Sequence, residues 1–106
     1  MSEDTYIEEL KQYCFQIFGK EKITNFEETN DTHFIIEYQE NEMIMQIIVR
    51  GLYNTDFEIA SLKLGEIIYF DYVFYGSDGE IKFAPEIIVS DWKRRLDSVL
   101  LLYSNK

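Results

Sequence analysis

The segment from Glu66 to Tyr75, with the sequence EIIYFDYVFY, constrains the fold more than any other part of the chain. It holds five aromatic rings among ten residues, together with β-branched side chains, and this composition favours an extended strand. Residues 76–79 follow as a turn signal, and EIKFA at 80–84 predicts a strand that returns beside the first. We therefore expect the fold to contain a sheet that includes this hairpin.

A second hairpin is predicted earlier in the chain. Residues 33–39 place Phe34, Ile36 and Tyr38 on one face of a strand, because side chains alternate along an extended backbone. After a polar loop at 40–42, a further strand alternates in the same way, and one of its faces holds Met43, Met45, Ile47 and Val49. Residues 22–28 predict a weaker strand before this hairpin.

The two ends of the chain predict amphipathic helices. Residues 5–18 repeat apolar side chains at helical spacing, at Ile7, Leu10, Cys14, Ile17 and Phe18. A second helix is expected from Glu86 or Ser90 to Tyr103, and its apolar side carries Ile88, Trp92, Leu96, Val99, Leu100 and Tyr103. We expect Trp92 to be a core residue.

Residues 56–64 fit two structures. If this segment and residues 66–75 were both strands of one hairpin, Gly65 alone would have to reverse the chain, and a hairpin loop needs about two residues at minimum. We therefore expect a short helix that begins with a capping box of Thr55 and Glu58 and ends at Gly65. The alternative is one long bent strand with a bulge at Gly65.

Together these elements predict an α+β fold in a single domain spanning residues 1–106. The expected order is α-β-β-β-(α)-β-β-α, with an antiparallel sheet of about five strands. Because short links join consecutive strands, we expect neighbours in sequence to pair. Both terminal helices should then pack on one face of the sheet.

The charge of the chain restricts its partners. Acidic residues outnumber basic ones by 20 to 10, so the net charge is −10 at pH 7. This balance argues against nucleic acid and anionic membranes as ligands and favours a basic protein partner. No apolar run is long enough for a membrane span, the N-terminal sequence lacks the features of a signal peptide, and there is a single cysteine. We therefore expect a soluble, cytoplasmic protein.

No motif in the sequence indicates an enzyme, a metal site or a bound cofactor. Cys14 and His33 are each the only residue of their kind. Cys14 lies on the apolar stripe of the first helix, so we expect a buried structural thiol, and His33 is expected to be a surface imidazole. Phosphate-binding loops, zinc-ligand spacing and calcium loops are all missing from the sequence.

The aromatic strand raises the question of which of its faces is covered. One alternate set, Ile68, Phe70, Tyr72 and Phe74, has the composition of a core. The other set combines Tyr69 and Tyr75 with Asp71, and tyrosine suits a half-wet binding surface. The strand is either central and covered on both faces, or it exposes the Tyr/Asp set for docking. A chain this short has few elements with which to cover both faces.

The first functional hypothesis is a small protein that binds and neutralises a basic partner, as an immunity protein or an antitoxin blocks a toxic nuclease. The candidate contact residues are Tyr69, Asp71, Tyr75, Glu37, Glu40, Glu42, Asp56 and Glu58. The alternatives are a phage-type inhibitor that mimics nucleic-acid charge, and a small-molecule domain with an apolar pocket lined by Met43, Met45, Phe70 and Phe74. The chain is expected to be a monomer or a weak homodimer, and a further hypothesis is a structural subunit whose Tyr-rich strand at 66–75 pairs with a copy of itself.

Overall fold

The structure is a computed structural model that describes residues 3–103. One long helix precedes the strands along the chain and another follows them. A short 3₁₀-helix, η1, comes directly after the first long helix. The elements are α1 (Glu3–Phe18), η1 (Lys20–Lys22), β1 (Ile23–Asn30), β2 (His33–Glu40), β3 (Met43–Arg50), β4 (Asn54–Ser61), β5 (Glu66–Phe74), β6 (Gly76–Ser77), β7 (Glu80–Ile81) and α2 (Pro85–Tyr103).

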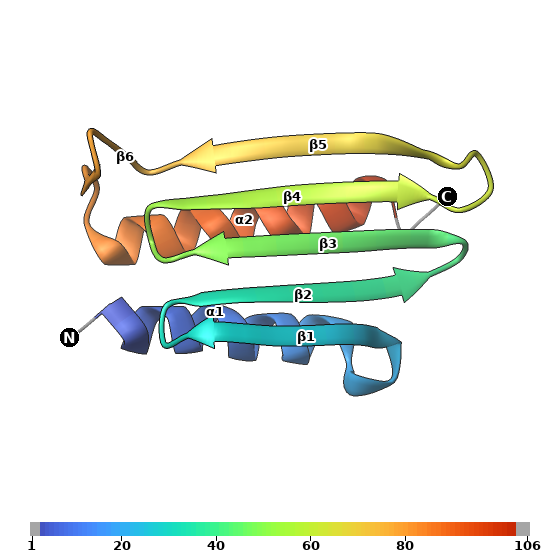
Figure 1. Cartoon of the computed structure of the whole chain (residues 1–106), viewed down its shortest axis with the longest axis horizontal. Coiled ribbons are helices and arrows are strands. Elements are labelled where there is room, and N and C mark those ends of the chain that lie inside the picture. The colour runs from blue at the N-terminus through green and yellow to red at the C-terminus, as the bar shows by residue number, and fades with distance from the viewer. Residues whose placement is uncertain (1–2, 104–106) are drawn as a thin grey trace.

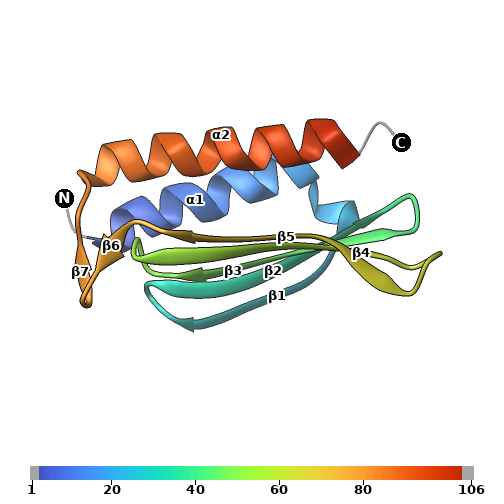
Figure 2. The same ribbon diagram turned by 90° about the horizontal axis from the view of Figure 1, so that it is seen from above.

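The five long strands form one antiparallel sheet in the order β1-β2-β3-β4-β5, so each strand pairs with its neighbour in sequence (Figure 1). Both helices lie on the same side of this sheet, which gives the molecule two layers (Figure 2). The α+β class, the antiparallel pairing and the placement of the terminal helices are therefore confirmed. The register of β2 and β3 also puts the predicted apolar sets on one face, with Ile36 opposite Ile47 and Tyr38 opposite Met45.

The short helix expected at 56–64 is wrong, because residues 54–61 form strand β4 in the middle of the sheet. The strand ends at Ser61, so the chain reverses over four residues, 62–65, rather than at Gly65 alone. The Gly65 N–H donates to the Ser61 carbonyl at 2.8 Å, and Gly65 has a φ of 70°, which favours glycine. Thr55, Phe57 and Ile59 are buried and alternate with half-buried residues, which is the two-residue period of a strand.

The strand expected at 80–84 forms only in part. Glu80 and Ile81 pair with Ser77 and Gly76 in a separate two-stranded ribbon, β6-β7, and the chain then leads into α2. Pro85 is the first residue of α2, a position where its missing N–H costs no helical hydrogen bond. The five-stranded sheet therefore includes β4 in place of the strand expected at 80–84, and β5 forms its hairpin with β4.

The core lies between the helices and the sheet. The apolar stripes of α1 and α2 meet the inward side chains of the central strands, and the largest fully buried residue is Trp92. Its indole N–H donates to the Thr55 hydroxyl at 3.0 Å, and its ring lies 5.5 Å from that of Phe57. Trp92 is thus a core residue, as predicted, with its single polar atom satisfied.

Candidate functional site

The side of the sheet opposite the helices is not covered by any element of residues 3–103 (Figure 2). We call this side the open face. Side chains alternate along each strand, so the register assigns every second residue to it. On β2 to β5 the open face carries His33, Ile35, Glu37, Gln39, Ile44, Gln46, Ile48, Arg50, Asn54, Asp56, Glu58, Ala60, Ile67, Phe70, Tyr72 and Phe74.

From Tyr69 onward the orientation of β5 is the reverse of the predicted one, while Ile68, before the register shift is complete, packs against the core as predicted. Phe70, Tyr72 and Phe74 were expected in the core, but they lie on the open face with 57%, 45% and 48% of their surface exposed. Val73 and Tyr75 instead are buried on the helix side. The register explains this result, because the buried Thr55 of β4 pairs with Val73 and so directs that side chain inward. We call Phe70, Tyr72 and Phe74 the aromatic strip.

The three residues that were expected to form an exposed Tyr/Asp surface all face the helix layer. Tyr75 is only 5% exposed, and its hydroxyl donates to Asp91 of α2 at 2.9 Å. Asp71 pairs with Arg95 of α2 at 3.3 Å. Tyr69 packs against the core and donates to Asp71 at 3.4 Å. The expectation of an uncovered Tyr69–Asp71–Tyr75 surface is therefore wrong, because α2 contributes counter-charges and packing above this side of β5.

Exposed apolar side chains concentrate on β5 and the turn before it. Among the described residues, six of the eleven large exposed hydrophobic side chains lie between positions 62 and 74, at Leu62, Leu64, Ile67, Phe70, Tyr72 and Phe74. Within the aromatic strip, the rings of Tyr72 and Phe74 meet edge to face at 4.3 Å. Tyr53 extends the series, with its ring 5.8 Å from Phe74. Contiguous apolar surface of this kind is typical of an interaction site.

Carboxylates border the aromatic strip on the neighbouring strands. Asp56 lies opposite Tyr72, and Glu58 lies opposite Phe70. The Asp56 carboxylate pairs with Arg50 at 3.1 Å, and its other oxygen, Oδ1, has no hydrogen-bond donor among the described residues. Glu58 forms no ion pair within residues 3–103. This border thus combines one compensated and one uncompensated carboxylate beside exposed rings.

The remaining predicted contact residues divide between two places. Glu37 is on the open face, where it accepts a hydrogen bond from Gln46 at 3.0 Å. Glu40 and Glu42 lie instead at the turn between β2 and β3, where Glu40 bonds Tyr38 and Lys22. The structure therefore brings together Glu37, Asp56 and Glu58, and leaves the other predicted carboxylates apart from them. Sequence reasoning missed the aromatic strip as a surface, because Phe70, Tyr72 and Phe74 have the apolar composition of a core set.

Cysteine and histidine often carry catalytic chemistry in proteins, but the surroundings of Cys14 and His33 in this chain fit a structural role. Cys14 is fully buried, and burial raises the pKa of its thiol, which keeps it protonated and unreactive. The His33 imidazole lies within hydrogen-bonding distance of Asn30 and Thr32. Residues 3–103 contain no group of three or more side chains that could hold a metal ion. In the same part of the chain, neither helix has the length and apolar character that crossing a bilayer requires.

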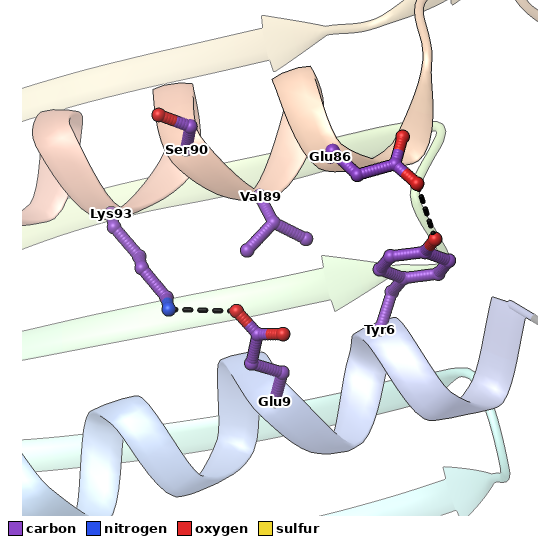
Figure 3. A pocket seen from close by; sticks show the side chains of 6 residues that line it. All are labelled: Tyr6, Glu9, Glu86, Val89, Ser90 and Lys93. Atoms are coloured by element: carbon purple, nitrogen blue, oxygen red, sulfur yellow. Dashed lines mark hydrogen bonds and ion pairs between the residues drawn. The ribbon is translucent and has the colours of Figure 1, made fainter. Parts of the chain in front are cut away.

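A shallow pocket lies between the two helices, on the side away from the sheet (Figure 3). Its volume is about 260 Å³, and Tyr6 and Glu9 of α1 line it together with residues of α2. Its polar groups already bond one another: Tyr6 donates to Glu86 at 2.7 Å, and Lys93 pairs with Glu9 at 2.7 Å (Figure 3). These bonds join α1 to α2, so the lining groups have a structural use.

The prediction of an apolar pocket lined by Met43, Met45, Phe70 and Phe74 is wrong. Its four lining residues do not face one cavity, because Met45 is buried among core residues while Phe70 and Phe74 lie on the opposite side of the sheet.

Comparison of the chain with protein-family models, curated proteins and solved structures found no match. The fold and the site define the chain as a two-layer α+β domain. Its open face is aromatic and acidic, and neither helix covers it.

Proposed function

We propose that this chain is a protein-binding domain whose open face docks a basic, partly apolar segment of another protein. The observation that carries the proposal is the aromatic strip, because three rings remain about half exposed on a sheet face that neither α1 nor α2 covers. A small domain gains stability by burying such rings. Rings left in water beside carboxylates therefore favour a surface that is completed by a partner.

The composition of the open face supports a partner that is basic and partly apolar. Rings of Phe and Tyr supply the desolvated centre that dominates most protein interfaces. Glu58 and Asp56 border this centre, and the whole chain carries a net charge of −10. Lys or Arg side chains of a partner would then reach the carboxylates while neighbouring apolar side chains contact the strip.

The proposed class of function is neutralisation of a basic protein, as in an immunity protein or an antitoxin acting in the cytoplasm. A nuclease binds phosphate through Lys and Arg side chains, and carboxylates on a docking partner would occupy those same cations. The electrostatic field of an acidic chain also accelerates encounter with a basic protein. Apolar contact through the strip would provide slow dissociation.

The experiment compares capture of basic proteins from native-host cells by three forms of the chain. The forms are the unaltered protein, the variant Phe70→Thr/Tyr72→Thr/Phe74→Thr, and the variant Glu58→Lys. Thr maintains strand propensity while it removes the rings. A basic protein that the unaltered chain captures is then purified, and its affinity for each form of the chain is measured by calorimetry at several salt concentrations.

The expected result is a dissociation constant that rises at least about tenfold in Glu58→Lys, and that also rises with salt. Glu21→Lys is the matched control, because it changes net charge equally at an exposed position in η1. Affinity unchanged in the triple Thr variant, or lowered equally by Glu21→Lys and Glu58→Lys, would contradict docking on the open face.

A further inference from the structure

Strand β5 forms one edge of the sheet, and its long side is uncovered. Among residues 3–103 it pairs only with β4, and Figure 1 shows α2 behind the inner strands rather than beyond the edge. The pairing of β5 with β4 is regular from Tyr69 to Phe74, and its register shift lies before Tyr69, opposite Ile59 and Ala60. An edge of this kind presents unpaired backbone groups to solvent, and proteins usually protect such edges.

The hydrogen-bond pattern identifies which backbone groups point off the edge. The Tyr75 N–H donates to the Tyr53 carbonyl at 2.8 Å, so Tyr75 directs its N–H toward β4. N–H and C=O groups alternate in direction along a strand, so Val73, Asp71 and Tyr69 also face β4. The backbone groups of Phe70, Tyr72 and Phe74 must therefore point outward. Within the described part of the chain these three residues make no backbone hydrogen bond outside the ladder, so the aromatic strip also carries backbone donors and acceptors that can bond a further strand.

Strand β1, at the opposite edge of the sheet, is better protected than β5 against the addition of a further strand. Strand β1 has register shifts near both of its ends, between Ile23 and Asn25 and between Glu28 and Asn30. Its exposed residues include Glu27 and Glu28. Bulges and charges are the usual devices that prevent a further strand from adding to an edge. Strand β5 has only two carboxylates, and one of these, Asp71, is compensated by Arg95.

One register allows β5 to pair with a copy of itself and use all the free groups. If Tyr72 lies opposite Tyr72 of a second chain in antiparallel pairing, Phe70 lies opposite the second chain's Phe74. All three outward-facing residues then pair with one another, and the aromatic side chains become cross-strand neighbours. This register also keeps Asp71 away from its own copy, because Asp71 lies opposite Val73. A shift that centres the pair on Asp71 would place two carboxylates face to face.

We infer that this chain forms a weak symmetric homodimer by antiparallel β5–β5 pairing centred on Tyr72. The two-fold axis runs through the extended sheet, so both open faces lie on the same side. The two aromatic strips then adjoin at the centre of one continuous surface. The dimer therefore deepens the proposed function, which would gain a docking face with two copies of each ring, but its formation does not depend on that function.

The first test uses cysteine cross-linking of the full chain. A Tyr72→Cys variant places thiols on facing strands whose Cα atoms are about 5.5 Å apart, within the range of a disulfide. Cys14 is buried and does not interfere. Glu27→Cys on the protected edge is the matched control. Under mild oxidation Tyr72→Cys is expected to form a covalent dimer at least about tenfold faster than Glu27→Cys. Equal rates for the two variants would overturn the inference.

The second test separates the dimer from partner binding. Sedimentation equilibrium of the unaltered chain should show self-association that strengthens as salt rises, because salt screens repulsion between two acidic copies. Binding of a basic partner has the opposite salt dependence. Tyr72→Pro removes an outward N–H and blocks pairing without breaking a bond to β4, so it should weaken the dimer at least about tenfold and remain folded by circular dichroism.

Amide hydrogen exchange supplies the deciding readout. The N–H groups of Phe70, Tyr72 and Phe74 should become protected as the concentration of the chain increases. A chain that stays monomeric with fast exchange at these three amides would overturn the inference. So would protection that arises only when a basic protein is added, because β5 would then receive a strand from that partner rather than from a second copy.

Discussion

The two faces of the sheet both carry aromatic rings in sequence, but the open face also carries charged side chains, and the two faces have opposite surroundings in the structure. On the helix side, Phe57 and Ile47 are fully buried beneath α1 and α2. On the open face, Phe70 and Tyr72 of the neighbouring strand are about half exposed. The comparison teaches that β5 carries aromatic rings on both sides with different surroundings: Tyr75 packs in the core on the helix side, and the rings on the open face remain about half exposed.

The largest expected effect is the loss of free energy of unfolding when a core residue on the helix side is replaced. Trp92→Ala should cost about 3–5 kcal/mol, because it leaves a cavity in the core and the Thr55 hydroxyl without its donor. Urea denaturation followed by circular dichroism measures the change. Trp92→Phe, which retains an aromatic ring but loses the indole N–H, should cost less. A loss below about 1 kcal/mol in the Ala variant would contradict the central position given to this residue.

A second difference concerns the acid sensitivity of the helix side. Burial alone raises the pKa of Asp91, but hydrogen bonds from Arg95, Arg94 and Tyr75 outweigh it and hold this pKa below its usual value. Asp91 therefore contributes stability above the pKa that it has in the unfolded chain, and this stability is lost as pH falls through the lower folded pKa. Asp91→Asn should cost about 1–3 kcal/mol at neutral pH.

The measurement for this prediction is the melting temperature between about pH 7 and pH 2, across the range in which carboxylates titrate. The unaltered chain and Asp91→Asn should converge as pH falls, because protonation removes the same charge that the substitution removes. A constant gap between the two curves would show that Asp91 acts by packing alone.

The smallest expected effect on stability is on the open face. Phe70→Thr and Tyr72→Thr should each change the free energy of unfolding by less than about 1 kcal/mol, because Thr maintains strand propensity and the rings are already half in water. The same urea titration provides the value. Losses equal to that of Trp92→Ala would mean that the aromatic strip supports the fold, and the contrast between the two faces would then fail.

The elements and their pairing could largely be predicted from local pattern. Alternation along β2 and β3 assigned Ile36 and Ile47 to the same face, and helical spacing found the buried stripe of α1. The prediction for β4 was wrong because the end of the strand was placed at position 64 instead of Ser61, which left no room for a turn. An error of three residues in the end of this strand was thus enough to favour a helix over a central strand.

The candidate site could be predicted only in part. Glu37, Asp56 and Glu58 do share one face, but their association with the aromatic strip required the register between β4 and β5. Local sequence favoured the opposite orientation of β5, since Phe70 and Phe74 are more apolar than Asp71. Arg95, which is distant in sequence and belongs to α2, pairs with Asp71 on the helix side.

The sequence by itself determined that this chain forms an acidic antiparallel sheet with a helix at each end, because strand and helix periodicities are local properties of side-chain spacing. Only the tertiary structure decided which side of β5 meets the helices. Both alternate sets on that strand contain rings, so burial energy alone separates them weakly, and the register with β4 together with the counter-charge from α2 made the choice.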